Sequence, residues 1–172
     1  MPRIPFRPSM LKVRRSSIRW IIIHHTAEIY DDPASRIDNS KYQMDSIFTD
    51  SMILKQPDVN YHYVIDKIKD EYVAVLCRPY VYECSWPDIH PDINKRALHV
   101  ALLGNYDFKV PPKRLYDVLS YRILNPFIKL FKISDSRILF HHQVSNNDSL
   151  TCPGVFLNHE IVISMTRKYV VK

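Results

Sequence analysis

The chain has 172 residues, 46% hydrophobic and 24% charged, a size and balance that predict one globular domain with a sizeable core. Its net charge of +6 favours an anionic partner, but no base-reading motif accompanies the charge, so nucleic-acid binding is not expected. No apolar run approaches the roughly 20 residues of a membrane span or forms a signal peptide, so we expect synthesis in the cytoplasm without a signal peptide.

The first half of the chain begins with a stretch rich in Arg and Lys, and we predict a basic N-terminal arm over residues 1–16 before a domain over 17–172. A β-branched apolar run at 19–23 predicts a buried strand. Asp32 and Pro33 predict the start of a helix within 33–50, and Pro57-Asp58 a turn. The later predicted strands cover 61–65 and 72–77, and we expect them to form a hairpin.

The second half opens with a proline-containing segment, residues 78–96, which predicts a long loop of a kind that is often functional. A buried strand is predicted at 98–103, and a helix after Pro111-Pro112 that Pro126 must kink or split. The last predicted elements are a short strand at 138–140 and a helix from about 155 to 168. Because strands alternate with helices, we predict an α/β fold: a single domain with a mixed central β-sheet flanked by helices.

Two histidine pairs and one cysteine stand where predicted strands end. The pairs are His24-His25 and His141-His142, and Cys152 follows before Pro-Gly. Adjacent side chains of a strand point to opposite faces, so each pair offers one imidazole to a site and turns the other away. Two imidazoles and a thiolate suit zinc, and three protein ligands leave the open position typical of catalytic zinc. The other cysteines, Cys77 and Cys84, complete no disulfide framework.

Four blocks of the sequence, in order, resemble one known family. IIIHHTA at 21–27 is similar to the IIHHTA opening of the type-2 N-acetylmuramoyl-L-alanine amidase and peptidoglycan recognition protein family. NYHYVID at 60–66 resembles its YHYVID strand, and ALHVALLGNYD at 97–107 resembles its SIGIELVGNFD stretch. HHQVSNNDSLTCPG at 141–154 resembles its closing HREV and TCPG motif. The resemblance covers roughly residues 19–160.

This resemblance implies a zinc ion in a surface cleft and hydrolysis of the amide between N-acetylmuramic acid and L-alanine in bacterial peptidoglycan. Carried over by position, the zinc ligands are His24, His141 and Cys152, and Tyr61 falls on the family's catalytic tyrosine. The tyrosine hydroxyl would donate a hydrogen bond to the developing oxyanion. The expected cofactor is one Zn²⁺ per chain, and the expected place of action is the bacterial cell wall.

Three positions depart from the family pattern. Ala101 stands where these amidases often have Glu, Leu150 where they often have Lys or Thr, and Trp86 where a loop His is common. The group that assists proton transfer is therefore open, and Thr151, one residue out of register, is a candidate. The residues that we assign to substrate binding are His25, Trp86 and Asn105.

Two alternative functions stay open. The first is a non-catalytic peptidoglycan-binding module: relatives of that kind generally lack the cysteine ligand, so Cys152 argues against it, whereas Ala101 and Leu150 argue mildly for it. The second is an amidase that also regulates a polymerase by protein contact, as some small phage members of the family do. The basic arm would then contact that protein or, in a lysin, an anionic wall polymer.

Overall fold

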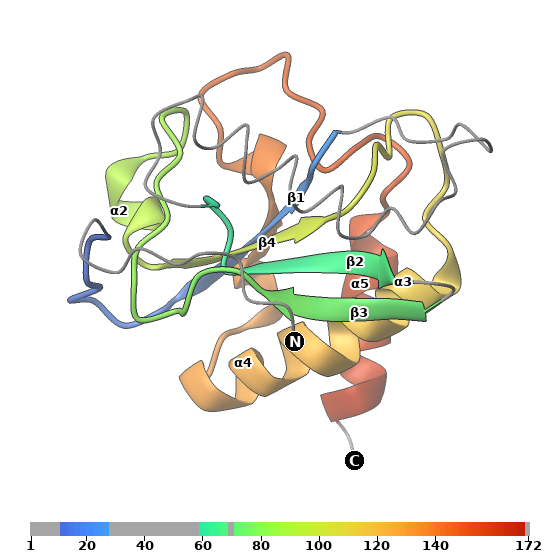
Figure 1. The fold of residues 1–172 in the computed structure, drawn as a ribbon, viewed down its shortest axis with the longest axis horizontal. Helices are drawn as coiled ribbons and strands as arrows, with labels where there is room; N and C mark the ends of the chain where they lie inside the picture. The colour runs from blue at the N-terminus through green and yellow to red at the C-terminus, as the bar shows by residue number, and fades with distance from the viewer. Residues whose placement is uncertain (1–10, 28–58, 69–70, 171–172) are drawn as a thin grey trace.

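A five-stranded mixed sheet forms the centre of the computed structural model, which describes residues 11–27, 59–68 and 71–170 (Figure 1). The strands are β1 (Trp20–His25), β2 (Tyr63–Ile68), β3 (Glu71–Leu76), β4 (Ala97–Leu102) and β5 (Ile138–Phe140). Their order across the sheet is β3-β2-β4-β1-β5. Only β2 and β3 pair antiparallel, as the predicted hairpin, and the other pairs are parallel. The predicted α/β class with a mixed sheet is confirmed.

β5 has the predicted bounds, and the boundaries of the other four strands differ from the predicted ones by one to three residues. β1 includes both His24 and His25, which we expected just beyond its end. β2 begins at Tyr63, so Tyr61 lies in the segment that leads into the strand and not within it. The helix predicted within 33–50 and the turn at Pro57-Asp58 lie outside the described residues.

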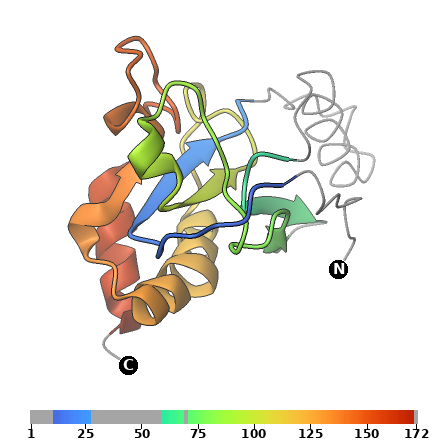
Figure 2. The same cartoon turned by 90° about the vertical axis from the view of Figure 1, so that its left-hand side faces the viewer.

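Helices cover one face of the sheet, as Figures 1 and 2 show from two directions. They comprise α3 (Lys113–Val118), a π-helical segment (Leu119–Leu124), α4 (Asn125–Phe131) and α5 (His159–Val170). Pro126 lies in the first turn of α4, where its missing N–H is tolerated. The wider π-helical segment before it interrupts the regular ladder of hydrogen bonds, so the predicted break takes the form of a change of helix type.

Two predictions for connecting segments were wrong in detail. The predicted loop at 78–96 contains a short helix, α2 (Pro91–Asn94). The last helix begins at His159 and not near residue 155, because the preceding residues are held in turns. The Phe156 N–H donates to the Tyr106 carbonyl, and the Asn158 side chain accepts from the Ile161 N–H, which starts the helix only there.

Alternation along the strands decides which side chains face the helices. Ile21 and Ile23 of β1, with Leu98 and Val100 of β4, belong to the large core between the sheet and α3, α4 and α5. The intervening residues of each strand therefore point to the other face. Among them is His24, which carries the chemistry described below.

Residues 11–16 of the predicted arm pack on the domain. Val13 forms an isolated antiparallel bridge with Tyr82, and the Arg14 guanidinium donates to backbone carbonyls of three segments. The boundary between arm and domain stays a prediction, since residues 1–10 are not described. Within the described part of the chain, no helix has the length and apolar character needed to cross a membrane.

Candidate metal centre

Three candidate ligands meet at one edge of the sheet. His24 lies near the end of β1, His141 begins a 3₁₀ turn directly after β5, and Cys152 follows on the next loop. Since β1 and β5 are parallel neighbours, their carboxyl ends lie together, where α/β sheets commonly place their sites. One ligand atom from each of the three residues lies within 4.8 Å of the other two. The three side chains are buried, with 0%, 4% and 7% of their residue surface exposed.

The hydrogen bonding of this cluster fits a metal ion. Nδ1 of His24 and Nε2 of His141 are buried, and neither makes a hydrogen bond within the described residues. A buried polar atom without a partner is costly, so His24 Nδ1 beside a thiol indicates room for a further group, whereas His141 Nε2 already lies 2.9 Å from Asp88 Oδ2. Two nitrogens and one sulfur are donors that zinc prefers. The expectation that the ion lies in a surface cleft stays a prediction.

The electrostatics of the cluster agree with this fit. Burial is the main cause that lowers the pKa values of His24 and His141, so both rings are neutral and able to offer a lone pair. Burial raises the pKa of the Cys152 thiol to about 12, although the His25 N–H, 3.4 Å from its sulfur, acts in the other direction. A divalent cation at this place would favour the thiolate strongly, because a coordinating thiol loses its proton.

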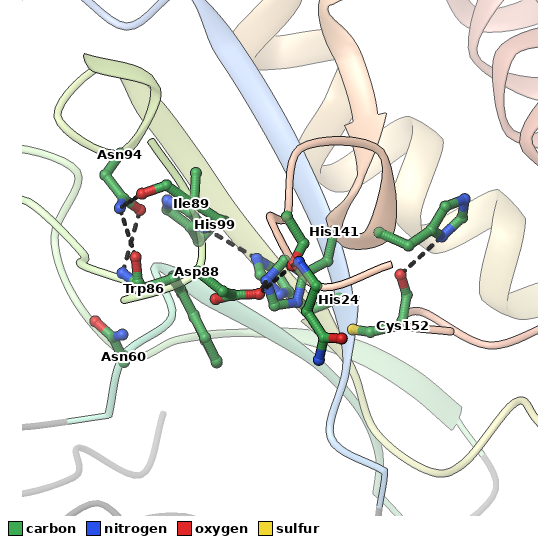
Figure 3. A network of polar contacts seen from close by, with 12 residues as sticks. His24, Asn60, Trp86, Asp88, Ile89, Asn94, His99, His141 and Cys152 are labelled. Atoms are coloured by element: carbon green, nitrogen blue, oxygen red, sulfur yellow. Dashed lines mark hydrogen bonds and ion pairs between the residues drawn. The ribbon is translucent and has the colours of Figure 1, made fainter. Parts of the chain in front are cut away.

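Each of the two histidines has a polar neighbour, and the sequence indicated neither neighbour (Figure 3). His24 Nε2 lies 2.9 Å from His99 Nδ1 of β4. His141 Nε2 lies 2.9 Å from Asp88 Oδ2, at ion-pair distance but without the alignment of a hydrogen bond. Asp88 also accepts from Ser145 Oγ at 2.6 Å. Since the neighbours of a ligating histidine tune its orientation, both residues belong to the site's environment.

Two aromatic rings pack beside His24. The Trp86 ring stacks on the His24 imidazole, with ring centroids 4.7 Å apart, and the Tyr61 ring meets the same imidazole edge-on at 5.5 Å. Tyr61 and Trp86 also contact each other, at 5.3 Å. The predicted catalytic tyrosine is therefore beside the candidate ligands, and Trp86, predicted to bind substrate, is half-buried against one of them.

Asparagines hold the 78–96 segment in place (Figure 3). The Asn94 amide donates to the carbonyls of Trp86 and Ile89, at 2.8 and 2.9 Å, and accepts from the Trp86 N–H. Asn60 Oδ1 accepts from the Ser85 N–H at 3.0 Å. These bonds fix the backbone on both sides of Asp88 and Trp86, so the segment expected to be functional does bring two residues to the site.

The remaining predicted site residues lie around the cluster. His25 is buried, and its Nδ1 accepts from the Tyr106 N–H at 3.2 Å, so its ring supports the loop after β4. Asn105 donates to the Ala27 carbonyl and accepts from the Asp107 N–H. The Thr151 hydroxyl is exposed and donates to Asp107 Oδ2 at 2.9 Å. Their assigned roles in catalysis and substrate binding stay predictions.

The second histidine pair differs from the strand geometry that we used to predict it. Both His141 and His142 lie in the 3₁₀ turn (His141–Gln143), so the alternation of a strand does not apply to them. His142 Nδ1 is nevertheless directed to the Cys152 carbonyl oxygen, 3.0 Å away, while His141 joins the cluster.

Comparison with known proteins agrees with the fold. The family model described as N-acetylmuramoyl-L-alanine amidase matches residues 14–155. The chain therefore belongs to the N-acetylmuramoyl-L-alanine amidase family, as the four sequence blocks predicted. Comparison of the sequence with curated proteins finds no match.

Solved structures share the fold at low sequence identity. Drosophila peptidoglycan recognition protein SD is 21% identical, with a TM-score of 0.67 over 88% of this chain and 83% of that one. The endolysin N-acetylmuramoyl-L-alanine amidase LysCS from Clostridium intestinale is 17% identical, with a TM-score of 0.70 over 96% and 93%. The complex of peptidoglycan recognition proteins LCa and LCx with tracheal cytotoxin is 17% identical, with a TM-score of 0.69 over 89% and 85%.

Proposed function

We propose that this protein is a zinc-dependent amidase that hydrolyses the bond between N-acetylmuramic acid and L-alanine in bacterial peptidoglycan. The observation that carries the proposal is the cluster of His24, His141 and Cys152, whose ligand atoms lie within 4.8 Å of one another. Membership of the amidase family supports the bond and the substrate. The proposed place of action is the cell wall, as a lysin.

The three clustered residues would hold one Zn²⁺. When bound, zinc polarises a carbonyl as a Lewis acid and lowers the pKa of a coordinated water. Tyr61 lies beside His24, and its hydroxyl would donate a hydrogen bond to the scissile carbonyl oxygen as negative charge develops there. A proton must also reach the departing amine of L-alanine. With Ala101 in place of a glutamate, Tyr61, Thr151 and Asp88 are the candidate groups near the cluster that carry an oxygen able to pass it.

The test is the digestion of purified sacculi by the zinc-loaded protein, with the new termini identified by mass spectrometry. We expect free amino groups on L-alanine and intact lactyl-ended glycan. Cys152→Ser should lose both zinc and cleavage, because it removes the sulfur ligand. Cys77→Ser is the matched control, since Cys77 is a buried cysteine that packs with Val64 and Val75 and is not one of the three clustered ligands, so this variant should keep zinc. Intact sacculi after treatment with zinc-loaded wild type would refute the amidase assignment.

A second candidate function is peptidoglycan binding without cleavage. It is favoured by Ala101 and Leu150, which lack the polar groups that amidases often carry there, and by likeness to peptidoglycan recognition proteins. Sedimentation with sacculi separates the two candidates: a binding module would sediment with intact sacculi and release no termini. A pull-down with protein lacking residues 1–10 would in turn test whether the arm contacts another protein or a wall polymer.

A further inference from the structure

Three histidines form a line across the face of the sheet that carries the cluster. His24 lies on β1, His99 on β4 and His62 one residue before β2. The parallel registers pair Ile22 with His99 and Tyr63 with Val100, which puts all three imidazoles on one face of neighbouring strands. Each histidine is 0% exposed. Burying a polar ring costs free energy unless its nitrogens are bonded, so the proton positions in this line are constrained.

Backbone groups determine which nitrogen of His62, the histidine farthest from the cluster, carries the proton. A backbone N–H always donates, and the N–H of His99 donates to His62 Nδ1 at 2.9 Å. The proton of the neutral His62 ring must then be on Nε2, where it donates to the Tyr82 carbonyl at 3.0 Å. His62 therefore holds the backbone N–H of His99 in β4 through Nδ1 and contacts the Tyr82 carbonyl through Nε2, which also lies 3.1 Å from an Arg14 nitrogen, so its role is structural.

Next to the cluster, His99 and His24 share one hydrogen bond between their imidazoles, and its proton can belong to either ring. His99 Nδ1 either donates to His24 Nε2, or accepts from it across the 2.9 Å between them. In the first arrangement a neutral His24 carries its own proton on Nδ1, which then has no lone pair for a metal. In the second arrangement the His24 proton is on Nε2, and the lone pair of the buried, unbonded Nδ1 is free to bind a metal.

We propose that His99 is a positioning residue for the metal centre: it accepts the Nε2 proton of His24, fixes that ring, and leaves Nδ1 of His24 as the metal ligand. The inference rests on the proposed zinc site. It assigns to an imidazole the task that a carboxylate, carbonyl or water commonly performs for a ligating histidine.

A purely structural role would not explain why a histidine occupies position 99. Its Nε2 is buried and makes no hydrogen bond within the described residues, so the ring leaves a polar atom unsatisfied in the interior. An apolar side chain of similar size would avoid that cost, since replacing such groups by apolar ones is often neutral or stabilising. The ring is nevertheless directed at His24 and touches the cluster through one nitrogen only.

The experiment measures zinc affinity by competition with a chelator in wild type, His99→Leu and His99→Asn. Leucine fills a similar volume without an acceptor, whereas Asn Oδ1 can occupy the place of His99 Nδ1. We expect His99→Leu to weaken zinc binding about 10- to 100-fold and His99→Asn to restore most of it. His159→Leu is the control: it removes a half-buried imidazole bonded to the Ile138 carbonyl, on α5, and should leave zinc affinity unchanged.

A second measurement does not depend on how the variants fold. Nitrogen-15 NMR of zinc-loaded wild type reports which imidazole nitrogen carries the proton, and we expect Nε2 for both His24 and His99. A proton on Nδ1 of His99, or unchanged zinc affinity in His99→Leu, would overturn this inference while the zinc site stands. Wild type that binds no zinc would overturn the proposed function and the inference with it.

Discussion

Gly154 allows the loop that carries Cys152 to lie against the segment after β4, and its replacement by alanine has a calculable cost. Its φ of +108° belongs to a region that residues with a side chain rarely adopt, which costs about 1–3 kcal/mol. A Cβ there would lie 2.4 Å from the backbone carbon of Tyr106 and 2.6 Å from its oxygen. The backbone of Tyr106 cannot move away as the end of a side chain can, so this steric overlap adds about 1–3 kcal/mol to the destabilisation. Gly154→Ala should therefore destabilise the fold by about 2–6 kcal/mol.

Gly104 supplies the matched control. Its φ of +115° imposes a similar backbone strain, but a Cβ there would make only ordinary contacts, with the end of the Lys109 side chain at 3.4 Å and the Tyr106 hydroxyl at 3.7 Å. Gly104→Ala should thus lose only about 1–3 kcal/mol, the strain alone. The difference between the two variants isolates the close approach of the loop to Tyr106.

The assay is urea unfolding of metal-free wild type and both variants, followed by zinc titration of whatever stays folded. Gly154→Ala should also bind zinc more weakly than Gly104→Ala, because a loop displaced from Tyr106 carries Cys152 away from the two histidines. A Gly154→Ala protein at least as stable as Gly104→Ala would show that the approach is not tight, and the reasoning would fail.

Three further predictions concern single side chains. Burial raises the pKa of Asp66 from 3.8 to about 6, so its contribution to stability is full below pH 3.8 and is lost as pH rises through 6, by about 3 kcal/mol. Asp66→Asn should remove this loss when urea unfolding is measured at a series of pH values. A pH profile of stability that is the same in Asp66→Asn as in wild type would exclude Asp66 as its cause. Asp88→Asn, which removes the charge 2.9 Å from His141 Nε2, should weaken zinc binding about 10-fold in chelator competition, and equal affinity would exclude the carboxylate from the site. Tyr61→Phe should lower turnover on a soluble muramyl-peptide roughly 100- to 1000-fold with zinc retained, whereas near wild-type turnover would remove Tyr61 from the mechanism.

The sequence was sufficient to predict those parts of the fold that depend on local patterns of residues. Apolar runs predicted every described strand, and the histidine pairs with Cys152 predicted which side chains would meet, because strand ends gather at one edge of a sheet. The start of α5 has one local signal, the Asn158 side chain that accepts from the Ile161 N–H, but the turn before it depends on a hydrogen bond from Phe156 to Tyr106, 50 residues earlier. Local propensity carries no information about such a contact.

The neighbours of the candidate ligands were beyond sequence reasoning for a similar reason. His99 occupies an apolar strand in which a single histidine has no signature, and it becomes informative only when the register sets it diagonally across from His24. Asp88 stands in a proline-containing segment, and its approach to His141 depends on the hydrogen bonds of Asn94 and Ser145. Long-range pairing therefore decided both positions.

The guanidinium of Arg14 makes the N-terminal segment part of the folding unit. It donates to the carbonyls of Tyr80, Lys95 and Ala97, and one of its nitrogens lies 3.1 Å from His62 Nε2. A fragment that began at residue 17 would leave these carbonyls without their donor, at the point where the histidine line ends. The shortest fragment of this protein that folds on its own should therefore start before Arg14. Local unfolding of the segment that contains Arg14 should expose the backbone amides around His62 and His99 to hydrogen exchange in the same step.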